Sequence, residues 1–166
     1  MKHWVMDYET LSNCFVGVFE HYKTQETKVF VIHELQNDLE KFIEFLQENV
    51  NNREWHISYN GLAFDAQVTH YIINNYKDWT ELSITNVTNL IYAYAQSCIE
   101  KSNNKQFSDY PIWKMKIGQI DVFKMHHWDN PAKRSSLKWI QYSMDWENIL
   151  DMPIHHNTKI AEQEQL

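Results

Sequence analysis

The spacing of apolar residues changes near residue 34, and this change limits which folds the chain can adopt. Before it, three runs rich in β-branched and aromatic residues alternate apolar with polar positions, which predicts strands at residues 3–9, 14–22 and 28–33. The breaks between these runs are short and polar, so an antiparallel meander is favoured. After residue 34, apolar residues recur every three or four positions, as on one face of a helix.

The rest of the chain alternates predicted helices with short predicted strands. Helices are expected at 35–50, 64–76, 87–100 and 135–142, with strands at 55–59 and 117–123. A meander followed by such alternation predicts an α/β fold with a mixed sheet and flanking helices. The chain has 166 residues and neither an internal repeat nor a low-complexity linker, so we assign residues 1–166 to one domain.

The composition restricts partners and compartment. The formal net charge of −7 argues against binding nucleic acid through phosphate contacts alone, unless the acidic residues gather at a metal site. Cys14 and Cys98 are isolated and lack zinc or disulfide spacing. The sequence shows no signal peptide and no apolar stretch of the ~20 residues needed to cross a bilayer. We therefore expect a cytoplasmic protein with no membrane partner.

Two carboxylates occur within the first predicted strand. Asp7 and Glu9 are two residues apart, so they point to the same face of that strand. Adjacent like charges repel, and a hard divalent cation such as Mg²⁺ or Mn²⁺ relieves the repulsion with oxygen ligands. The alternative is that both side chains lie on a solvated edge of the sheet and bind nothing.

A third carboxylate, Asp65, closes the segment Asn60-Gly61-Leu62-Ala63-Phe64-Asp65. This segment lies where a predicted strand ends and a helix begins, and α/β sheets bind ligands at the carboxyl ends of their strands. Asp65 is thus placed where it could join Asp7 and Glu9. The alternative is ordinary helix capping by Asn60, with Asp65 in a favourable first turn.

Taken together, the two motifs resemble a known family. Asp-x-Glu-Thr in the first strand and Asn-x-x-x-Phe-Asp at residues 60–65 are similar to the first and second motifs of the DEDD (DnaQ-like) 3′→5′ exonuclease superfamily. The resemblance covers residues 3–75. Residues 120–123 and 136–140 also look like the section before the third motif in phage and polymerase-associated members. The resemblance implies a ribonuclease-H-like fold with a three-strand antiparallel meander plus parallel strands.

The resemblance also implies roles for the carboxylates. In this family two metal ions, Mg²⁺ or Mn²⁺, activate a water for in-line attack on the terminal phosphodiester and stabilise the leaving 3′ oxygen. By resemblance Asp7 would bridge both metals, Glu9 would bind one of them, and Asp65 would hold the second through water.

Substrate contacts are implied in the same way. Thr10 and Leu11 follow the first motif, where the family contacts the terminal nucleotide. Leu11 would wedge against the last base, and Thr10 would hydrogen-bond near the 3′ hydroxyl. Asn60 and Phe64 would shape the path of the strand, although Phe64 fits a core position equally well.

One element of the family pattern is not found. The family has a fourth aspartate on a C-terminal helix, with a Tyr four or a His five residues before it. Asp145, Asp151 and the pair His155-His156 are the remaining candidates, and none has this spacing. We therefore interpret the chain as an exonuclease domain that stops before this helix and has an incomplete two-metal site. Zinc is not expected at His126-His127 or His155-His156, since adjacent histidines on a strand face opposite ways and no Cys is near.

The sequence thus predicts a metal-dependent 3′→5′ exonuclease acting on single-stranded DNA ends, with RNA as an alternative substrate. A polymerase or replication protein is an expected partner, and a composition rich in Asn, Lys, Ile and Tyr suggests an AT-rich genome such as that of a phage. The competing hypothesis is a catalytically impaired ribonuclease-H-like module that binds nucleic acid or a protein partner. The missing fourth carboxylate favours this second hypothesis, whereas the three intact carboxylates favour the first.

Overall fold

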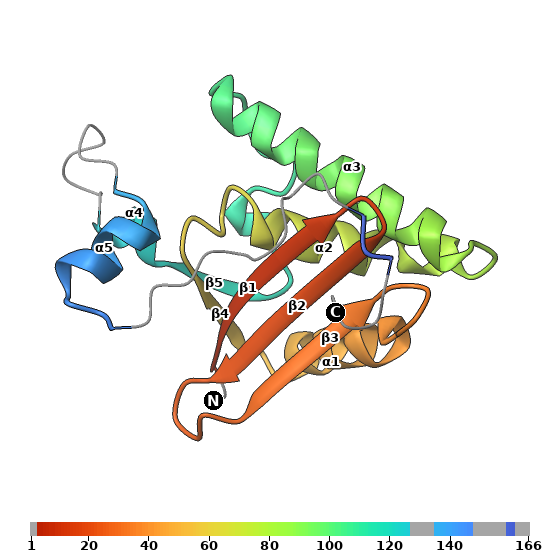
Figure 1. Ribbon diagram of the computed structural model, residues 1–166, viewed down its shortest axis with the longest axis horizontal. Helices are drawn as coiled ribbons and strands as arrows, with labels where there is room; N and C mark the ends of the chain where they lie inside the picture. The colour runs from red at the N-terminus through yellow and green to blue at the C-terminus, as the bar shows by residue number, and fades with distance from the viewer. Residues whose placement is uncertain (1–2, 127–134, 148–158, 162–166) are drawn as a thin grey trace.

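A five-stranded mixed sheet forms the centre of the computed structural model, which describes residues 3–126, 135–147 and 159–161 (Figure 1). Its strands are β1 (His3–Leu11), β2 (Cys14–His21), β3 (Thr27–Ile32), β4 (Trp55–Ser58) and β5 (Gly118–Asp121), in the spatial order β3-β2-β1-β4-β5. The first three strands pair antiparallel, whereas β4 runs parallel to β1 and β5 runs parallel to β4. The predicted α/β class, with a meander plus parallel strands, is confirmed.

Helices flank this sheet. They are α1 (Leu39–Asn51), α2 (Asp65–Asn75), α3 (Ile84–Asn103), α4 (Val122–His126) and α5 (Leu137–Ser143), with 3-10 turns at Tyr76–Trp79 and Ile112–Lys114. In Figure 1, α1, α2 and α3 lie behind the sheet, and α4 and α5 lie to one side of it. Within the described ranges, no helix is both long and apolar enough to span a membrane.

The core lies between the sheet and the three longer helices, and aromatic rings fill much of it. Along β1 the buried side chains are Trp4, Met6 and Tyr8, which alternate with exposed ones, as a strand covered on one face requires. Phe19 of β2 meets Phe45 of α1 edge to face, with ring centroids 4.8 Å apart. The period-two pattern of the strands therefore selects which face receives the helices.

The first helix begins later than its apolar spacing suggests. The predicted helix starts at residue 35, whereas α1 begins at Leu39. The side-chain oxygen of Asn37 accepts a hydrogen bond from the Leu39 N–H at 3.1 Å, and Asp38 accepts one from the Val31 N–H at 3.2 Å. These bonds fix residues 37 and 38 to β3 and to the first residue of α1, so the helix begins only at Leu39.

The last strand ends earlier than predicted. The expected strand at 117–123 stops at Asp121, and the chain enters α4 at Val122. The Asp121 carboxylate accepts a hydrogen bond from the Lys124 N–H at 3.2 Å, which satisfies a donor in the first turn of α4. Residues 122 and 123 thus belong to a helix despite their strand-like composition, and the Asp121–Lys124 hydrogen bond stabilises its first turn.

Two buried histidines connect the helices to the strands beneath them. His70 Nε2 accepts a hydrogen bond from the Lys116 N–H at 2.8 Å, so its Nδ1 carries the proton and donates to the Ala66 carbonyl at 2.6 Å. His56 Nε2 accepts from the Asn49 amide at 3.0 Å. Burial lowers the pKa of both imidazoles, that of His56 to about 3. Both rings are therefore neutral in the folded protein.

This arrangement predicts acid sensitivity. The folded-state pKa lies below the unfolded value near 6.5, so the stabilisation is complete above about pH 6.5 and is lost as the pH falls from there towards 3. Each such site contributes a slope of up to about 1.4 kcal/mol per pH unit to the free energy of unfolding. The free energy of unfolding can be measured by urea denaturation at several pH values between about 4.5 and 7.5. Plotted against pH, it should change less steeply for His56→Asn than for wild type. His126→Asn, at an exposed site, is the control, and equal slopes for all three proteins would contradict the prediction.

Candidate functional site

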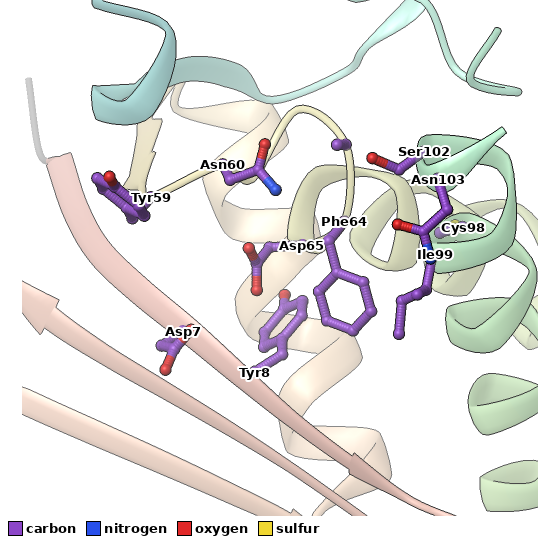
Figure 2. Close-up of a pocket in the computed structure, with 11 residues that line it drawn as sticks. Asp7, Tyr8, Tyr59, Asn60, Phe64, Asp65, Cys98, Ile99, Ser102 and Asn103 are labelled. Carbon is purple, nitrogen blue, oxygen red and sulfur yellow. The ribbon is translucent and has the colours of Figure 1, made fainter. Parts of the chain in front are cut away.

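A pocket of about 410 Å³ opens between β1, the turn that leads from β4 into α2, and the C-terminal end of α3 (Figure 2). Four of the seven predicted site residues line it: Asp7, Asn60, Phe64 and Asp65. Tyr8, Tyr59 and the last two turns of α3 complete its walls. The structure thus brings together residues from the two sequence motifs, which belong to different elements.

Asp7 and Glu9 share one face of β1, as their spacing predicts. Their side chains point away from the face that carries Tyr8 and the helices. The pairing of β1 with β4 covers only His3–Val5, so among the described residues Asp7 and Glu9 have a paired strand, β2, on one side only, and both are exposed. Desolvation raises the pKa of both carboxyls, and the charge of Asp7 raises that of Glu9 further. Glu9 is not among the residues that line the pocket.

Asp65 is the first residue of α2, and its side chain is only 4% exposed. Its Oδ1 atom is buried and has no hydrogen-bond partner among the described residues. Burial raises the pKa of Asp65 to about 8, and the charge of Asp7 is the next largest cause. An unpaired buried carboxylate oxygen is costly, so a proton or a cation at this position would be strongly favoured.

The turn that places Asp65 depends on two unusual residues. Asn60 has φ 62°, in the left-handed region that asparagine tolerates better than most residues. A Cβ atom on Gly61 would lie 1.8 Å from Ser58 Oγ, so only glycine fits there. The residue before α2 is Phe64, without a side-chain cap, so the alternative in which Asn60 caps this helix is wrong.

A fourth carboxylate, Asp121, holds this turn from the neighbouring strand. One oxygen accepts the Asn60 N–H at 3.0 Å and the other accepts the Leu62 N–H at 3.1 Å. Asp121 is 4% exposed and lies beside Ser58 in the parallel β4–β5 pair. Its charge also contributes to the raised pKa of Asp65. Sequence reasoning did not select Asp121 as a site residue, although a carboxylate that ends a parallel strand is a signal of the same kind as Asp65.

Thr10 and Leu11 lie outside the pocket. Leu11 is buried in a small separate cluster with Cys14, Val31 and Ile160. Ile160 is held there because its backbone N–H and carbonyl both bond to the Asn13 side chain, at 3.0 and 2.7 Å. The predicted contact of Leu11 with a terminal base does not fit this buried position. Thr10 is half-buried in β1.

The described side chains offer an incomplete metal site. Among residues 3–126, 135–147 and 159–161, no group of three or more His, Cys, Asp or Glu side chains is arranged to hold a metal ion. Asp7 and Asp65 nevertheless share a pocket, and the unpaired Asp65 oxygen is a hard ligand of the type that Mg²⁺ and Mn²⁺ prefer.

Of the candidates for a fourth family carboxylate, the structure describes Asp145 alone. Asp145 follows α5 in an exposed turn and is not a lining residue. Asp151 and the pair His155-His156 lie outside the described residues. His126 is the exposed last residue of α4, and His127 is also outside the described residues.

Comparisons with protein-family models, with curated proteins and with solved structures find no match to this chain.

The two bonds from Asp121 to the turn lead to a stability prediction. Asp121→Asn keeps one acceptor oxygen but places an NH₂ group opposite the second N–H, so a buried donor loses its partner. The free energy of unfolding should fall by about 1–3 kcal/mol. Hydrogen exchange at the Asn60 and Leu62 amides should also accelerate. Asp78→Asn, at an exposed site, is the control; unchanged exchange at both amides would show that Asp121 does not hold the turn.

Proposed function

We propose that the chain has a ribonuclease-H-like fold and acts as a metal-dependent 3′→5′ exonuclease on single-stranded DNA ends. One observation carries the proposal: Asp7 of β1 and Asp65 at the start of α2 both line one pocket, where a buried Asp65 oxygen has no partner among the described residues. Carboxylates from a strand centre and from a strand-to-helix turn are what a phosphodiester-cleaving metal site needs.

The electrostatics of the pocket favour a cation. Desolvation raises the pKa of both Asp7 and Asp65, and the charge of Asp7 raises that of Asp65 further. A divalent cation neutralises both charges at once and supplies the missing partner of the Asp65 oxygen. The proposal assigns Asp7 and Asp65 as ligands and Glu9 as a further ligand from the same strand face.

When bound, Mg²⁺ or Mn²⁺ supplies an activated water and stabilises the leaving oxygen. Hydrolysis breaks the bond between phosphorus and the 3′ oxygen of the preceding nucleotide. The water oxygen ends on the released 5′-mononucleotide, and the shortened strand keeps a 3′ hydroxyl. Asn60 and the half-buried Phe64 ring border the pocket, so they are proposed to guide the terminal nucleotide.

The second candidate function is a catalytically impaired module that binds nucleic acid or a protein partner. The observation that favours it is the lack of a three-ligand group within the described ranges. A site with only two carboxylates binds a metal ion more weakly and stabilises a transition state less than a complete one. Metal binding and cleavage therefore need separate tests.

Metal binding should appear as thermal stabilisation. A ligand that binds only the folded state adds about 1.4 kcal/mol at ten times its Kd, so Mn²⁺ should raise the Tm of the wild-type protein. Asp65→Asn and Asp7→Asn should each reduce this rise, because each removes a charged ligand from the pocket. Glu81→Gln, an exposed acid outside the pocket, should respond like wild type. If both pocket variants gain as much stability from Mn²⁺ as wild type, the ion binds elsewhere.

Cleavage is tested with single-stranded DNA labelled at the 3′ or the 5′ end and incubated with Mn²⁺. Exonuclease action predicts a ladder of products shortened from the 3′ end. Asp7→Ala should lower the rate by about a thousandfold or more, because the loss of a metal ligand removes several kcal/mol of transition-state stabilisation.

The matched control is Glu20→Ala, which removes an exposed carboxylate beside Val5 on the adjacent strand β2. This variant should cleave as wild type does. DNA binding without cleavage by the wild-type chain would favour the binding module instead.

A further inference from the structure

The loop at residues 104–114 leaves the C-terminal end of α3, whose Ser102 and Asn103 line the pocket. It carries exposed apolar side chains: Phe107 is 98% exposed, Trp113 is 81% exposed and Ile112 is 55% exposed. Large aromatic rings are normally buried in a core, so this exposure on a loop that follows the pocket-lining end of α3 indicates a binding surface.

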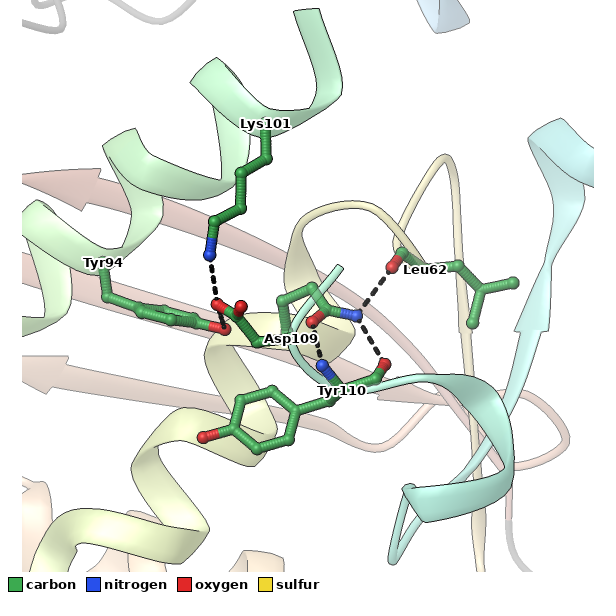
Figure 3. Close-up of polar contacts among 6 residues, drawn as sticks. Leu62, Tyr94, Lys101, Asp109 and Tyr110 are labelled. Carbon is green, nitrogen blue, oxygen red and sulfur yellow. Dashed lines mark hydrogen bonds and ion pairs between the residues drawn. The ribbon is translucent and has the colours of Figure 1, made fainter. Parts of the chain in front are cut away.

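This loop is fixed to the turn that holds Asp65. The buried Gln67 side chain on α2 accepts a hydrogen bond from the Tyr110 N–H and donates one to the Tyr110 carbonyl, both at 2.9 Å (Figure 3). The same amide nitrogen donates to the Leu62 carbonyl at 2.9 Å. One side chain thus bonds to both segments, and the loop keeps a fixed position beside the pocket.

A second anchor lies between Phe107 and Tyr110. The Asp109 carboxylate pairs with Lys101 and accepts a hydrogen bond from the Tyr94 hydroxyl at 3.2 Å (Figure 3). Tyr94 stacks on Tyr71 of α2, with ring centroids 4.1 Å apart and planes inclined by 6°. The backbone beneath the exposed rings is therefore anchored to both α2 and α3.

The charge of this region is opposite to that of the whole chain. Residues 104–114 contain Lys105, Lys114 and one acidic residue, Asp109, and so carry a formal charge of +1 in a chain of −7, with Lys101 and Lys116 on either side. Exposed aromatic rings among lysines are typical of surfaces that bind single-stranded nucleic acid, where the rings stack on bases and the cations contact phosphates. The core of a protein–protein interface is instead depleted in lysine.

We propose that Phe107 and Trp113 form a stacking surface for the unpaired bases of a single strand whose 3′ end enters the pocket. Lys105 and Lys114 contact the phosphates of the same strand. This inference rests on the proposed function and refines its substrate: the preferred substrate is a single strand several nucleotides long, because the bases of a duplex do not present free faces.

Substitutions that keep apolar character but remove the aromatic face test stacking directly. Phe107→Leu and Trp113→Leu should each weaken binding of an oligothymidylate of about 12 nucleotides roughly tenfold, whereas Phe107→Trp and Trp113→Phe should retain it. Binding is measured by fluorescence anisotropy in Ca²⁺, with a duplex of the same length for comparison. Tyr22→Leu, at an exposed ring between β2 and β3, is the control for loss of an aromatic side chain elsewhere.

Kinetics then separate this inference from the exonuclease proposal. Phe107→Leu and Trp113→Leu should raise the KM for the oligonucleotide with little change in kcat. They should leave hydrolysis of the nitrophenyl ester of thymidine 5′-monophosphate unchanged, since it fills only the terminal position. Suppose the wild-type chain binds the oligonucleotide but does not cleave it, and the leucine variants lose this binding. That result would support the stacking surface and contradict the exonuclease proposal.

Two outcomes would overturn the stacking surface. The first is cleavage and binding that are unaffected by either leucine substitution, which would leave the exonuclease proposal intact. The second is unchanged oligonucleotide binding together with an altered sedimentation coefficient, which would make the loop a protein contact, such as one between two copies of this chain.

Discussion

The central strand β1 separates two environments, and the rest of the structure depends on that separation. Its even-numbered side chains, Trp4, Met6 and Tyr8, are buried beneath the helices, while Asp7 and Glu9 occupy the other face. A shift of one residue in register would exchange these sets, burying two carboxylates and exposing three large apolar groups. The aromatic core therefore fixes where the carboxylates can be, and the position of the pocket follows from it.

Asp65 departs from the rule that buried polar atoms have hydrogen-bond partners. Around it, Asp121 satisfies two N–H groups of the turn, and Gln67 links the same turn to the 104–114 loop. The polar contacts of its neighbours are thus satisfied, yet the Asp65 Oδ1 atom has no partner within the described ranges. An unpaired buried polar atom among well-bonded neighbours is characteristic of a functional site, because a bound ligand can supply the missing interaction.

The sequence allowed more of the fold than of the site to be predicted. Apolar spacing gave the order of strands and helices, and the two-residue spacing placed Asp7 and Glu9 on one face. The buried position of Leu11 was not foreseen, because Leu11 packs in a cluster with Ile160, which is distant in sequence, and no local pattern encodes that contact. The contribution of Asp121 depends on the pairing of β4 with β5, which spacing along one segment does not reveal.

The proposed function requires an acidic chain to bind a polyanionic substrate, and the distribution of charge is compatible with that requirement. The pocket carboxylates repel a phosphate until a cation lies between them, so metal binding and strand binding are coupled at the 3′ end. On the 104–114 loop, lysines and exposed rings are the groups that we propose to attract the strand without a metal. Affinity for the strand and hydrolysis of its last bond are thereby assigned to different residues, Phe107 and Trp113 for the first and Asp7 and Asp65 for the second. Under this proposal, strand binding is retained even where the metal site is incomplete.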